Sequence, residues 1–297
     1  MNYVITGGAG NISAPLIKKL LAAGKRVTVV GRNAENLKEL TQAGATAAIG
    51  SVEDVTFLTK TFKDADAVYT MVPPKWDAPQ WKKYIGSIGE NFAAAIKGSR
   101  VKHVVNLSSI GAHLPDGCGP VSGLYLAEQA LNKLEDVNIL HLRPSYFYQN
   151  LLSNVGLIKH AGIMGSNFAI DNNKFPIVDP QDITAAAFEE LTSLKFTGHS
   201  VRYIVSDEIS TDAIAKAVGS AIGKPDLAWV KFEDEQALQG MLQAGLPKEV
   251  AENYAEMGAA LHSGKMAEDY WKHRTGTLGK VKLADFAKVF AGIYAAS

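Results

Sequence analysis

The sequence predicts an α/β protein with a doubly wound parallel sheet and a smaller carboxyl-terminal α+β lobe. In the first half, short apolar runs alternate with amphipathic segments, which is the pattern of parallel strands joined by crossover helices. This alternation fades after Asn150. We therefore expect a core domain over residues 1–150. A smaller lobe over residues 151–297 should pack on it, with strands that cross back into the core.

Six apolar runs rich in β-branched residues are expected to form the sheet. They are Tyr3–Thr6, Arg26–Val30, Thr46–Ile49, Ala67–Met71, Val101–Leu107 and Asn138–Leu142. Six strands in this order are sufficient for a doubly wound sheet, which binds its ligand outside the carboxyl ends of the strands.

The segment after the first strand has the spacing of a helix with one buried face. Ile12, Leu16 and Leu20 recur every four residues, and Gly24 closes the segment. Pro15 falls in the first turn, where a missing N–H costs little. Similar segments predict helices at Ala34–Gln42, Val55–Phe62 and Gln80–Lys97.

The second half predicts further elements, although its pattern is less regular. Strands are expected at Val201–Val205 and Leu227–Phe232. Helices are expected at Pro180–Leu194, Thr211–Ile222, Glu233–Leu242, Lys248–His262 and Leu283–Tyr294.

Composition narrows the function classes. The 30 basic and 30 acidic residues give a formal net charge of zero, so no overall field attracts nucleic acid or an anionic membrane. The single cysteine, Cys118, excludes an intramolecular disulfide, and with His113 it lacks the further ligands of a zinc site. No apolar run approaches about 18 residues and no basic segment precedes the first strand. We therefore expect no metal, no membrane span and a cytoplasmic protein.

A glycine-rich turn joins the first strand to the first helix. Strand, glycine turn and amphipathic helix together form the Rossmann dinucleotide-binding fingerprint. Gly7 permits the tight turn, and Gly10 lets the backbone at Asn11 and Ile12 approach a pyrophosphate at the helix N-terminus. Ser13 stands where a third glycine is often found. The alternative is a glycine turn required only for packing.

The end of the second strand indicates which dinucleotide binds. An NAD site has an acidic side chain about 20 residues after the glycine turn, to accept a hydrogen bond from the ribose 2′-hydroxyl. This chain has Arg32 there instead, and a guanidinium suits a 2′-phosphate. The cofactor is therefore expected to be NADP(H). The alternative is a surface arginine in a helix-capping turn with Asn33.

Five segments in order resemble the NmrA-like family of atypical short-chain dehydrogenase/reductases over essentially the whole chain. They are Thr6–Ile12 with Gly31-Arg32, Val105–Ala112, Leu142–Asn150, Phe175–Ile183 and Leu283–Ala287. The resemblance implies a Rossmann domain that binds NADP(H) and a small lobe that closes over the nicotinamide. Members of this family divide into reductases of quinones, dyes or phenylpropanoids and NADP-dependent sensors that bind protein partners.

The resemblance also implies further site residues by position. After the fourth strand, Met71, Val72 and Pro73 should run along the cofactor. Near the nicotinamide it places residues that follow the fifth and sixth strands, namely Ser108, Ser109, Pro144 and Tyr146 with its neighbours.

The chain departs from the wider superfamily at the proton donor. That donor is usually a tyrosine with a lysine four residues later, and none of the ten tyrosines has one. Tyr125, followed by Gln129, is the candidate catalytic residue, with the alternative of a core or rim aromatic. Glu128 fits the acidic position that family members often carry on this helix. Because no convincing donor is present, sugar-nucleotide epimerase activity becomes a weaker third hypothesis.

Aromatic residues gather in the loops expected to face the cofactor. Trp76, Phe147 and Tyr148 are the candidate substrate contacts, because a flat apolar molecule could stack on them. The alternative is that these rings join the two lobes. We therefore expect a reductase of a small aromatic or quinone-like acceptor. The main alternative is a non-catalytic redox sensor that binds a protein partner, and a homodimer remains open.

Overall fold

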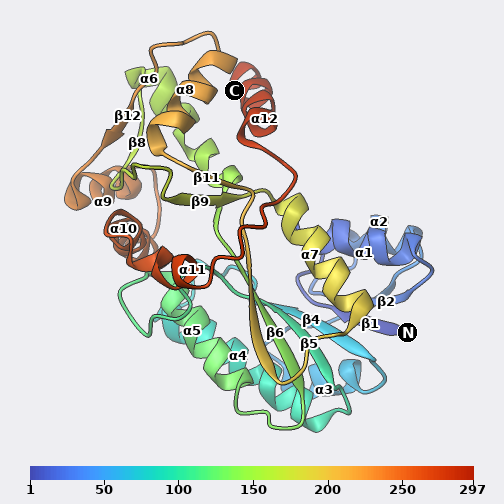
Figure 1. Ribbon diagram of the computed structural model, residues 1–297. Coiled ribbons are helices and arrows are strands. Elements are labelled where there is room, and N and C mark those ends of the chain that lie inside the picture. The colour runs from blue at the N-terminus through green and yellow to red at the C-terminus, as the bar shows by residue number, and fades with distance from the viewer. The chain divides into compact units, whose positions relative to one another are not determined.

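The six apolar runs of the first half and one later strand, β10, assemble into one sheet of seven strands, in the order β10-β6-β5-β4-β1-β2-β3 (Figure 1). The computed structural model describes all 297 residues. Every pairing from β3 to β6 is parallel, so the predicted fold class is confirmed. The strands are β1 (Asn2–Ile5), β2 (Arg26–Gly31), β3 (Thr46–Ile49), β4 (Ala67–Met71), β5 (His103–Leu107), β6 (Asn138–Pro144) and β10 (His199–Ile204).

The strand order reverses direction at β1. Ile5 lies opposite Val29 of β2 on one side and Tyr69 of β4 on the other. The chain therefore winds outward in both directions from this point, and a doubly wound sheet binds ligands in the crevice that results. The glycine turn begins where β1 ends, so the topology places it at that crevice.

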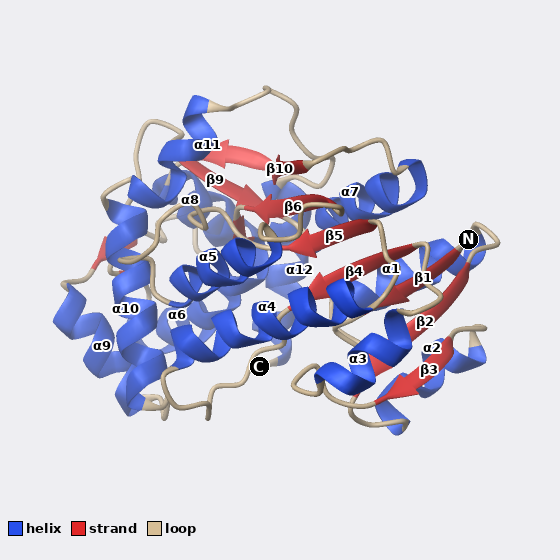
Figure 2. Cartoon of the chain, turned by 90° about the horizontal axis from the view of Figure 1, so that it is seen from below, coloured by secondary structure: helices blue, strands red, loops and turns tan.

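Helices cover both faces of this sheet. Figure 2 shows α3 (Val55–Phe62) and α4 (Trp81–Gly98) crossing one face together. Their apolar side chains form one core with alternate residues of the strands; this core includes Leu58, Phe62, Ile88, Phe92, Val4, Val68 and Val104. Helix α1 (Ser13–Ala22) buries Leu16, Ile17 and Leu20, the stripe predicted from the sequence.

The second predicted helix is shorter than expected. Residues 34–42 form a 3-10 turn, η1 (Glu35–Leu37), followed by one turn of α-helix, α2 (Lys38–Gln42). The side-chain oxygen of Asn33 accepts a hydrogen bond from the amide of Glu35 at 2.8 Å. This local bond favours a turn over a regular helical start.

The chain divides into two compact units. The first contains residues 1–109, 123–143 and 183–202, and the second contains residues 110–122, 144–182 and 203–297. The sequence predicts one boundary after Asn150, with strands that cross back into the core; in the structure the segment 183–202 belongs to the first unit. That segment carries most of α7 (Pro180–Ser193) and of the edge strand β10.

The second unit has two small sheets and several helices. One sheet has the order β11-β9-β7 and the other pairs β12 with β8. Its strands are β7 (Tyr146–Phe147), β8 (Met164–Ser166), β9 (Phe175–Val178), β11 (Asp207–Ile209) and β12 (Trp229–Lys231). Its helices are η2 (Tyr148–Asn154), α6 (Val155–Ala161), α8 (Thr211–Ala221), α9 (Asp234–Gln243), α10 (Lys248–His262), η3 (Lys265–Ala267), α11 (Glu268–Lys272) and α12 (Leu283–Ala296).

The remaining helix is α5 (Pro120–Leu131). None of the helices combines the length and hydropathy that a membrane span requires.

Candidate functional site: a nucleotide cavity

The glycine turn has a backbone that only glycine adopts at low cost. Gly7 has φ +91° and Gly8 has φ +52°, both in the left-handed region. A Cβ atom added to Gly7 would lie 2.6 Å from Ser13 Oγ and 2.7 Å from Met71 Cγ. A side chain at Gly7 is therefore excluded by conformation and by space, and one at Gly8 is disfavoured by conformation, which leaves the backbone of the turn exposed to a ligand.

Two hydroxyl groups form hydrogen bonds that fix the turn at the carboxyl end of β1. Ser13 Oγ donates a hydrogen bond to the carbonyl oxygen of Thr6 at 3.0 Å. The amide of Met71 donates to Thr6 Oγ1 at 2.9 Å, which ties the end of β1 to the end of β4. Ser13 thus replaces the third glycine with a small side chain that fixes helix α1 against β1.

The start of helix α1 has no capping side chain. The residue before it, Ile12, makes no side-chain hydrogen bond to the first turn. Within the first turn the amide of Ala14 donates to the carbonyl oxygen of Gly10 at 2.9 Å and Pro15 has no N–H, so the amides that precede Ala14, together with the helix dipole, are the groups that favour an anion. This arrangement fits the diphosphate of a dinucleotide.

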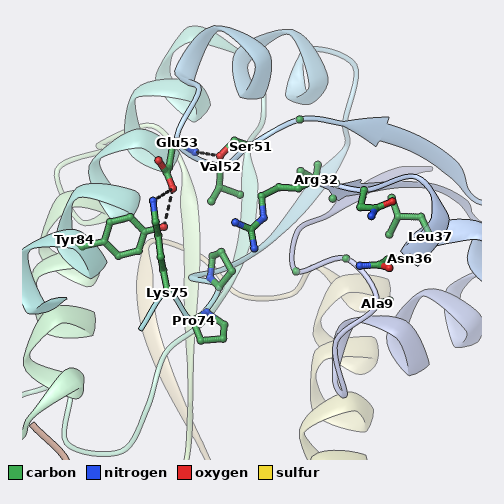
Figure 3. A pocket seen from close by; sticks show the side chains of 17 residues that line it. Ala9, Arg32, Asn36, Leu37, Ser51, Val52, Glu53, Pro74, Lys75 and Tyr84 are labelled. Carbon is green, nitrogen blue, oxygen red and sulfur yellow. Dashed lines mark hydrogen bonds and ion pairs between the residues drawn. The ribbon is translucent and has the colours of Figure 1, made fainter. Parts of the chain in front are cut away.

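Next to the turn lies a cavity of about 770 Å³, built from the carboxyl ends of four neighbouring strands (Figure 3). All of its lining residues belong to the first unit. They are Gly7, Gly8, Ala9, Val30, Gly31, Arg32, Asn33, Asn36, Leu37, Gly50, Ser51, Val52, Glu53, Pro73, Pro74, Lys75 and Tyr84.

Arg32 is the unpaired cation of this cavity. Its guanidinium is directed into the space between the loops, as Figure 3 shows, and no hydrogen bond or ion pair involves it. An arginine beside a carboxylate would normally form a paired contact. The side chain is therefore available to an anion that enters the cavity.

On the facing wall, Glu53, Lys75 and Tyr84 form a connected cluster (Figure 3). Glu53 Oε1 accepts hydrogen bonds from Lys75 Nζ at 3.0 Å and from the Tyr84 hydroxyl at 3.1 Å. The bond from Lys75, with smaller contributions from Tyr84 and from the charge of Arg32, lowers the pKa of Glu53. Burial, followed by the bond to Glu53, raises the pKa of Tyr84 to about 12. Glu53 is therefore ionised and Tyr84 is neutral at physiological pH.

Of the predicted cofactor residues, Gly7, Arg32 and Pro73 line the cavity. The other predicted residues of the first unit lie at the carboxyl ends of the strands but do not line the cavity. They are Gly10, Asn11, Ile12, Met71, Val72, Ser108 and Ser109. Lys75, Tyr84 and Asn36 line the cavity but were not predicted as cofactor contacts. They come from three separate segments, and only the position of Lys75 after β4 could have indicated its place.

Ser108 and Glu128 belong to a buried ion-pair cluster. The Glu128 carboxylate, 1% exposed, accepts two hydrogen bonds from Arg143, from Nε at 3.0 Å and from Nη2 at 2.6 Å. The Ser108 hydroxyl donates to the same carboxylate at 2.5 Å. Both carboxylate oxygens of Glu128 thus accept hydrogen bonds from Arg143 or Ser108. No hydrogen bond joins Glu128 to the half-buried Tyr125, three residues earlier. A proton relay through Glu128 is not formed in this structure.

The aromatic residues of the predicted substrate region have different environments. Trp76 is 52% exposed in the loop after β4. In the second unit, Phe147 is half-buried, whereas Tyr148 is fully buried, stacks on Phe286 at 5.1 Å and donates its hydroxyl to Asp207 at 2.5 Å. Tyr148 is therefore a core residue in this structure, because its ring and its hydroxyl are both occupied.

Pro144 and Tyr146, the remaining predicted cofactor residues, also lie in the second unit. Pro144 is buried, and the half-buried ring of Tyr146 packs at 5.2 Å from Phe175 and at 5.7 Å from Phe168. Burial raises the pKa of Tyr146, so its hydroxyl stays protonated.

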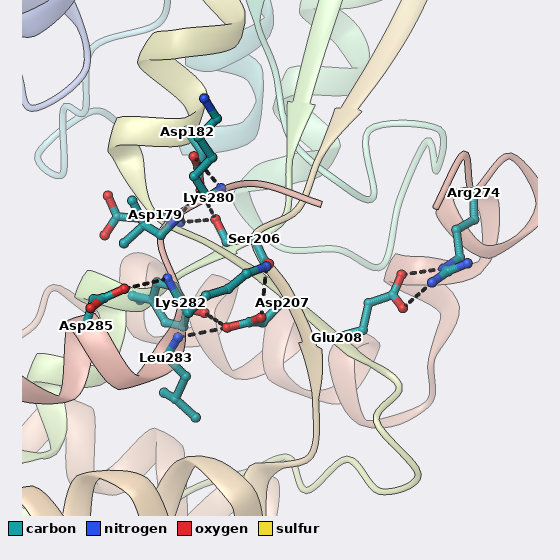
Figure 4. Close-up of polar contacts among 12 residues, drawn as sticks. Asp179, Asp182, Ser206, Asp207, Glu208, Arg274, Lys280, Lys282, Leu283 and Asp285 are labelled. Atoms are coloured by element: carbon teal, nitrogen blue, oxygen red, sulfur yellow. Dashed lines mark hydrogen bonds and ion pairs between the residues drawn. The ribbon is translucent and has the colours of Figure 1, made fainter. Parts of the chain in front are cut away.

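Asp182 of the Phe175–Ile183 motif and Asp207 of β11 have a structural role (Figure 4). Asp182 accepts hydrogen bonds from Ser206 Oγ at 2.6 Å and from the amides of Lys280 at 2.9 Å and Val281 at 3.1 Å. Asp207 accepts one from the amide of Leu283 at 2.8 Å. These carboxylates fix the segment before α12 within the second unit.

The comparisons with known proteins agree with this geometry. Residues 7–147 match the NAD(P)H-binding family model. An uncharacterized protein of Schizosaccharomyces pombe is 26% identical over 264 residues, which covers 80% of this chain and 85% of that protein.

Three solved structures share the fold along the chain. The NADPH-dependent quinone oxidoreductase of Escherichia coli, solved with NADPH, has a TM-score of 0.81 and 16% identity and covers 98% of this chain and 99% of its own. Triphenylmethane reductase of Citrobacter sp., solved with NADP(H), has a TM-score of 0.79 and 18% identity and covers 98% and 100%. NmrA, a negative transcriptional regulator solved with NAD, has a TM-score of 0.71 and 15% identity and covers 98% and 91%.

The resemblance stated from the sequence motifs is confirmed by these comparisons, and the NAD(P)H cofactor class with it. The glycine turn, the uncapped helix and the cavity beside them all lie within the matched residues. Residues 7–147 thus match the NAD(P)H-binding family model, and the chain shares its Rossmann fold with these three solved structures.

Proposed function

We propose that the protein is an NADP(H)-dependent reductase of a quinone-like or extended aromatic acceptor. The observation that carries the cofactor choice is the unpaired guanidinium of Arg32 inside the glycine-turn cavity. A free guanidinium offers several N–H donors in a fixed fork, which suits the phosphate that distinguishes NADP(H) from NAD(H).

The residues present fit this cofactor. The glycine turn and the start of α1 would hold the diphosphate, and Ser51 and Val52 of the same cavity would flank the adenine. Arg32 would hold the 2′-phosphate. When bound, the cofactor supplies a hydride to the acceptor, and the protein contributes position and electrostatics.

The choice of acceptor follows from the proton donors. Reduction of a simple carbonyl needs a donor at the developing alkoxide, and the usual tyrosine–lysine pair is absent because Gln129 follows Tyr125 at that spacing. Glu128 is held by Arg143 and Ser108. A quinone tolerates the anion that hydride transfer produces, so water or a tyrosine hydroxyl is sufficient. The fold shared with a quinone oxidoreductase and a dye reductase supports this class.

A titration followed by a turnover assay tests the proposal. Purified protein is titrated with NADPH and NADH by calorimetry, and NADPH oxidation is then followed against a panel of quinones and triphenylmethane dyes. We expect tighter binding of NADPH and turnover with at least one acceptor class. Failure to bind either nucleotide would refute the cofactor assignment, and binding without turnover would refute the reductase.

The second candidate function is a redox sensor that binds NADP(H) and a protein partner. The observation that favours it is the engagement of Glu128, which leaves helix α5 without a free acid or base. The regulator NmrA shares the fold. This function predicts nucleotide affinity without turnover on any acceptor, together with a partner whose binding changes with the NADPH/NADP ratio.

A further inference from the structure

The cavity that holds Arg32 also contains a carboxylate that should oppose NADP(H). Glu53 lines the same space, and the charge of Arg32 contributes to its lowered pKa. An acidic side chain near the ribose normally selects NAD(H) and repels a 2′-phosphate. The presence of Glu53 therefore requires a compensating charge if the cavity is to accept the phosphate.

Lys75 supplies that charge. Its ammonium lies 3.0 Å from Glu53 Oε1 and 5.2 Å from the centre of the Tyr84 ring. An ammonium has three N–H donors, so the bond to Glu53 leaves donors for a second anion. The side chain of Lys75 is 32% exposed and lines the cavity, so a ligand can reach it.

The position of Lys75 is set by a rigid element. Tyr84 belongs to the 18-residue helix α4 and packs against the core of the sheet. Its hydroxyl holds Glu53 at 3.1 Å, and Glu53 holds Lys75. Helix α4 thus fixes an ammonium on the wall that faces Arg32, although the lysine itself comes from a loop (Figure 3).

The charges of the cavity then match the ligand. Two cations and one carboxylate leave one net positive charge. A phosphate monoester carries about −1.5 to −2 at pH 7, so it gains from both cations. Without Lys75, Arg32 and Glu53 would cancel, and Glu53 would be free to accept a hydrogen bond from a ribose hydroxyl.

We propose that Lys75 is the second cationic ligand of the 2′-phosphate and that Glu53, pinned by Tyr84, sets the nucleotide preference through it. With the ammonium of Lys75 present, the cavity binds NADP(H) more tightly than NAD(H). Without it, the charge of Glu53 reverses this preference. This inference rests on the proposed function, because it concerns the same nucleotide site.

The test is a set of single and double variants titrated by calorimetry. The variants are Lys75→Met, Glu53→Gln and their combination. The ligands are NADPH, NADH and the fragment pair adenosine 2′,5′-bisphosphate and 5′-AMP, which reports the phosphate contact without the nicotinamide. The matched control is Lys18→Met, because Lys18 forms a comparable ion pair with Glu39 at 2.6 Å in the same unit and does not line the cavity.

Lys75→Met should lower the affinity for NADPH and for the bisphosphate by about 10- to 100-fold, the range of a charge-assisted contact. The affinity for NADH and for 5′-AMP should fall by no more than about threefold, or should rise. In that background, Glu53→Gln should restore about tenfold of the lost NADPH affinity, because it removes an unpaired carboxylate and keeps its size. Lys18→Met should change the affinity for neither nucleotide.

Two results would overturn the inference. One is an equal effect of Lys75→Met on NADPH and NADH, which would make the Lys75–Glu53 pair purely structural. The other is a double variant no better than Lys75→Met. Both results leave the proposed function intact when the wild type binds NADPH and Arg32→Ala weakens that binding. A wild type that binds neither nucleotide would instead refute the proposed function.

Discussion

Two arginines of the first unit differ in what surrounds their guanidinium groups. Arg143 is buried with Glu128, which accepts two of its N–H groups, and the pair is completed by Ser108. Arg32 is exposed, faces a cavity and has no partner. Both residues lie at the carboxyl ends of strands in one sheet, so the sequence position alone does not separate them. The difference teaches that a buried arginine paired with a carboxylate fixes the protein, whereas an exposed arginine beside a cavity is available to a ligand.

The largest effect should come from removal of the buried partner. Glu128→Gln leaves the Arg143 charge without a counter-ion in the interior, so the free energy of unfolding should fall by about 3–5 kcal/mol. Chemical denaturation measures this loss. The double variant Glu128→Leu with Arg143→Met should recover much of it, because the buried charge is gone.

The exposed Lys18–Glu39 pair provides the control for this result. Glu39→Gln should change the free energy of unfolding by about 0.5 kcal/mol or less, since both side chains are solvated. If Glu128→Gln were as mild as Glu39→Gln, the contrast between a buried and an exposed pair would not hold.

The next largest effect should appear at Arg32, in binding rather than in stability. Arg32→Ala should weaken the binding free energy of NADPH by about 1.5–3 kcal/mol, the scale of a hydrogen bond to a charged group, and should leave that of NADH nearly unchanged. The midpoint of unfolding should stay the same, because the side chain has no partner to lose. Calorimetric titration measures the affinities, and the control is Arg26→Ala at the start of β2, the strand that Arg32 follows. Equal losses for both nucleotides would remove Arg32 from the 2′-phosphate.

A third prediction concerns the neutral chain of hydrogen bonds beside the Arg143 pair. Asn106 Nδ2 lies 3.1 Å from His141 Nδ1, and His141 Nε2 lies 2.9 Å from Asn132 Oδ1. Asn106 Oδ1 accepts from Thr70 Oγ1 at 2.9 Å, so its amide donates to the ring and the ring donates to Asn132. Burial lowers the pKa of His141 to about 4.

Because the folded protein resists protonation of His141, its stability depends on pH. The contribution is fully present above the ordinary histidine pKa of about 6.5 and is lost as the pH falls towards 4. Between pH 7 and pH 5.5 the loss should be about 1 kcal/mol. His141→Gln retains a donor and an acceptor but does not titrate, so its stability should fall less over this range. Parallel pH profiles of the two proteins would contradict the assignment to His141.

The smallest effect should come from a buried hydroxyl with no hydrogen-bond partner. The ring of Tyr69 is fully buried in β4, and its hydroxyl oxygen is unpartnered. Tyr69→Phe removes that unsatisfied group, so the free energy of unfolding should rise by about 1 kcal/mol or less and thermal unfolding should shift to a slightly higher temperature. Tyr148→Phe is the matched comparison, because it breaks the bond to Asp207 and should destabilise the protein. A loss of stability in Tyr69→Phe would show that its hydroxyl has a partner, such as a buried water.

The sheet and the glycine turn follow closely from the sequence. Thr46–Ile49 and Ala67–Met71 were predicted with the observed bounds. Ala67–Met71 is a continuous apolar run because that strand is buried on both faces, whereas Thr46–Ile49 is the partly exposed edge strand. The helix Val55–Phe62 was predicted equally well, since Asp54 caps it by accepting from the amide of Phe57. Local signals of this kind are complete within a few residues.

The facing wall of the cavity depends on contacts that no local pattern reports. Glu53, Lys75 and Tyr84 are brought together by two loops and a helix, so their hydrogen bonds appear only once the sheet is assembled. The same limit applies to Tyr148, since an aromatic residue that stacks on Phe286 has the same local sequence signal as one that faces a substrate. Neither the charge cluster nor the buried ring could be predicted from composition or spacing.

The return of residues 183–202 to the first unit has a practical consequence for dissection of the gene. A fragment that ends at Asn150 lacks β10, so the backbone groups of β6 that β10 would pair are left as an open edge, together with the apolar surface that α7 covers. Open strand edges recruit other chains. Such a truncated product should therefore precipitate on expression, and a nucleotide-binding module will have to be built by grafting the later segment onto the earlier one.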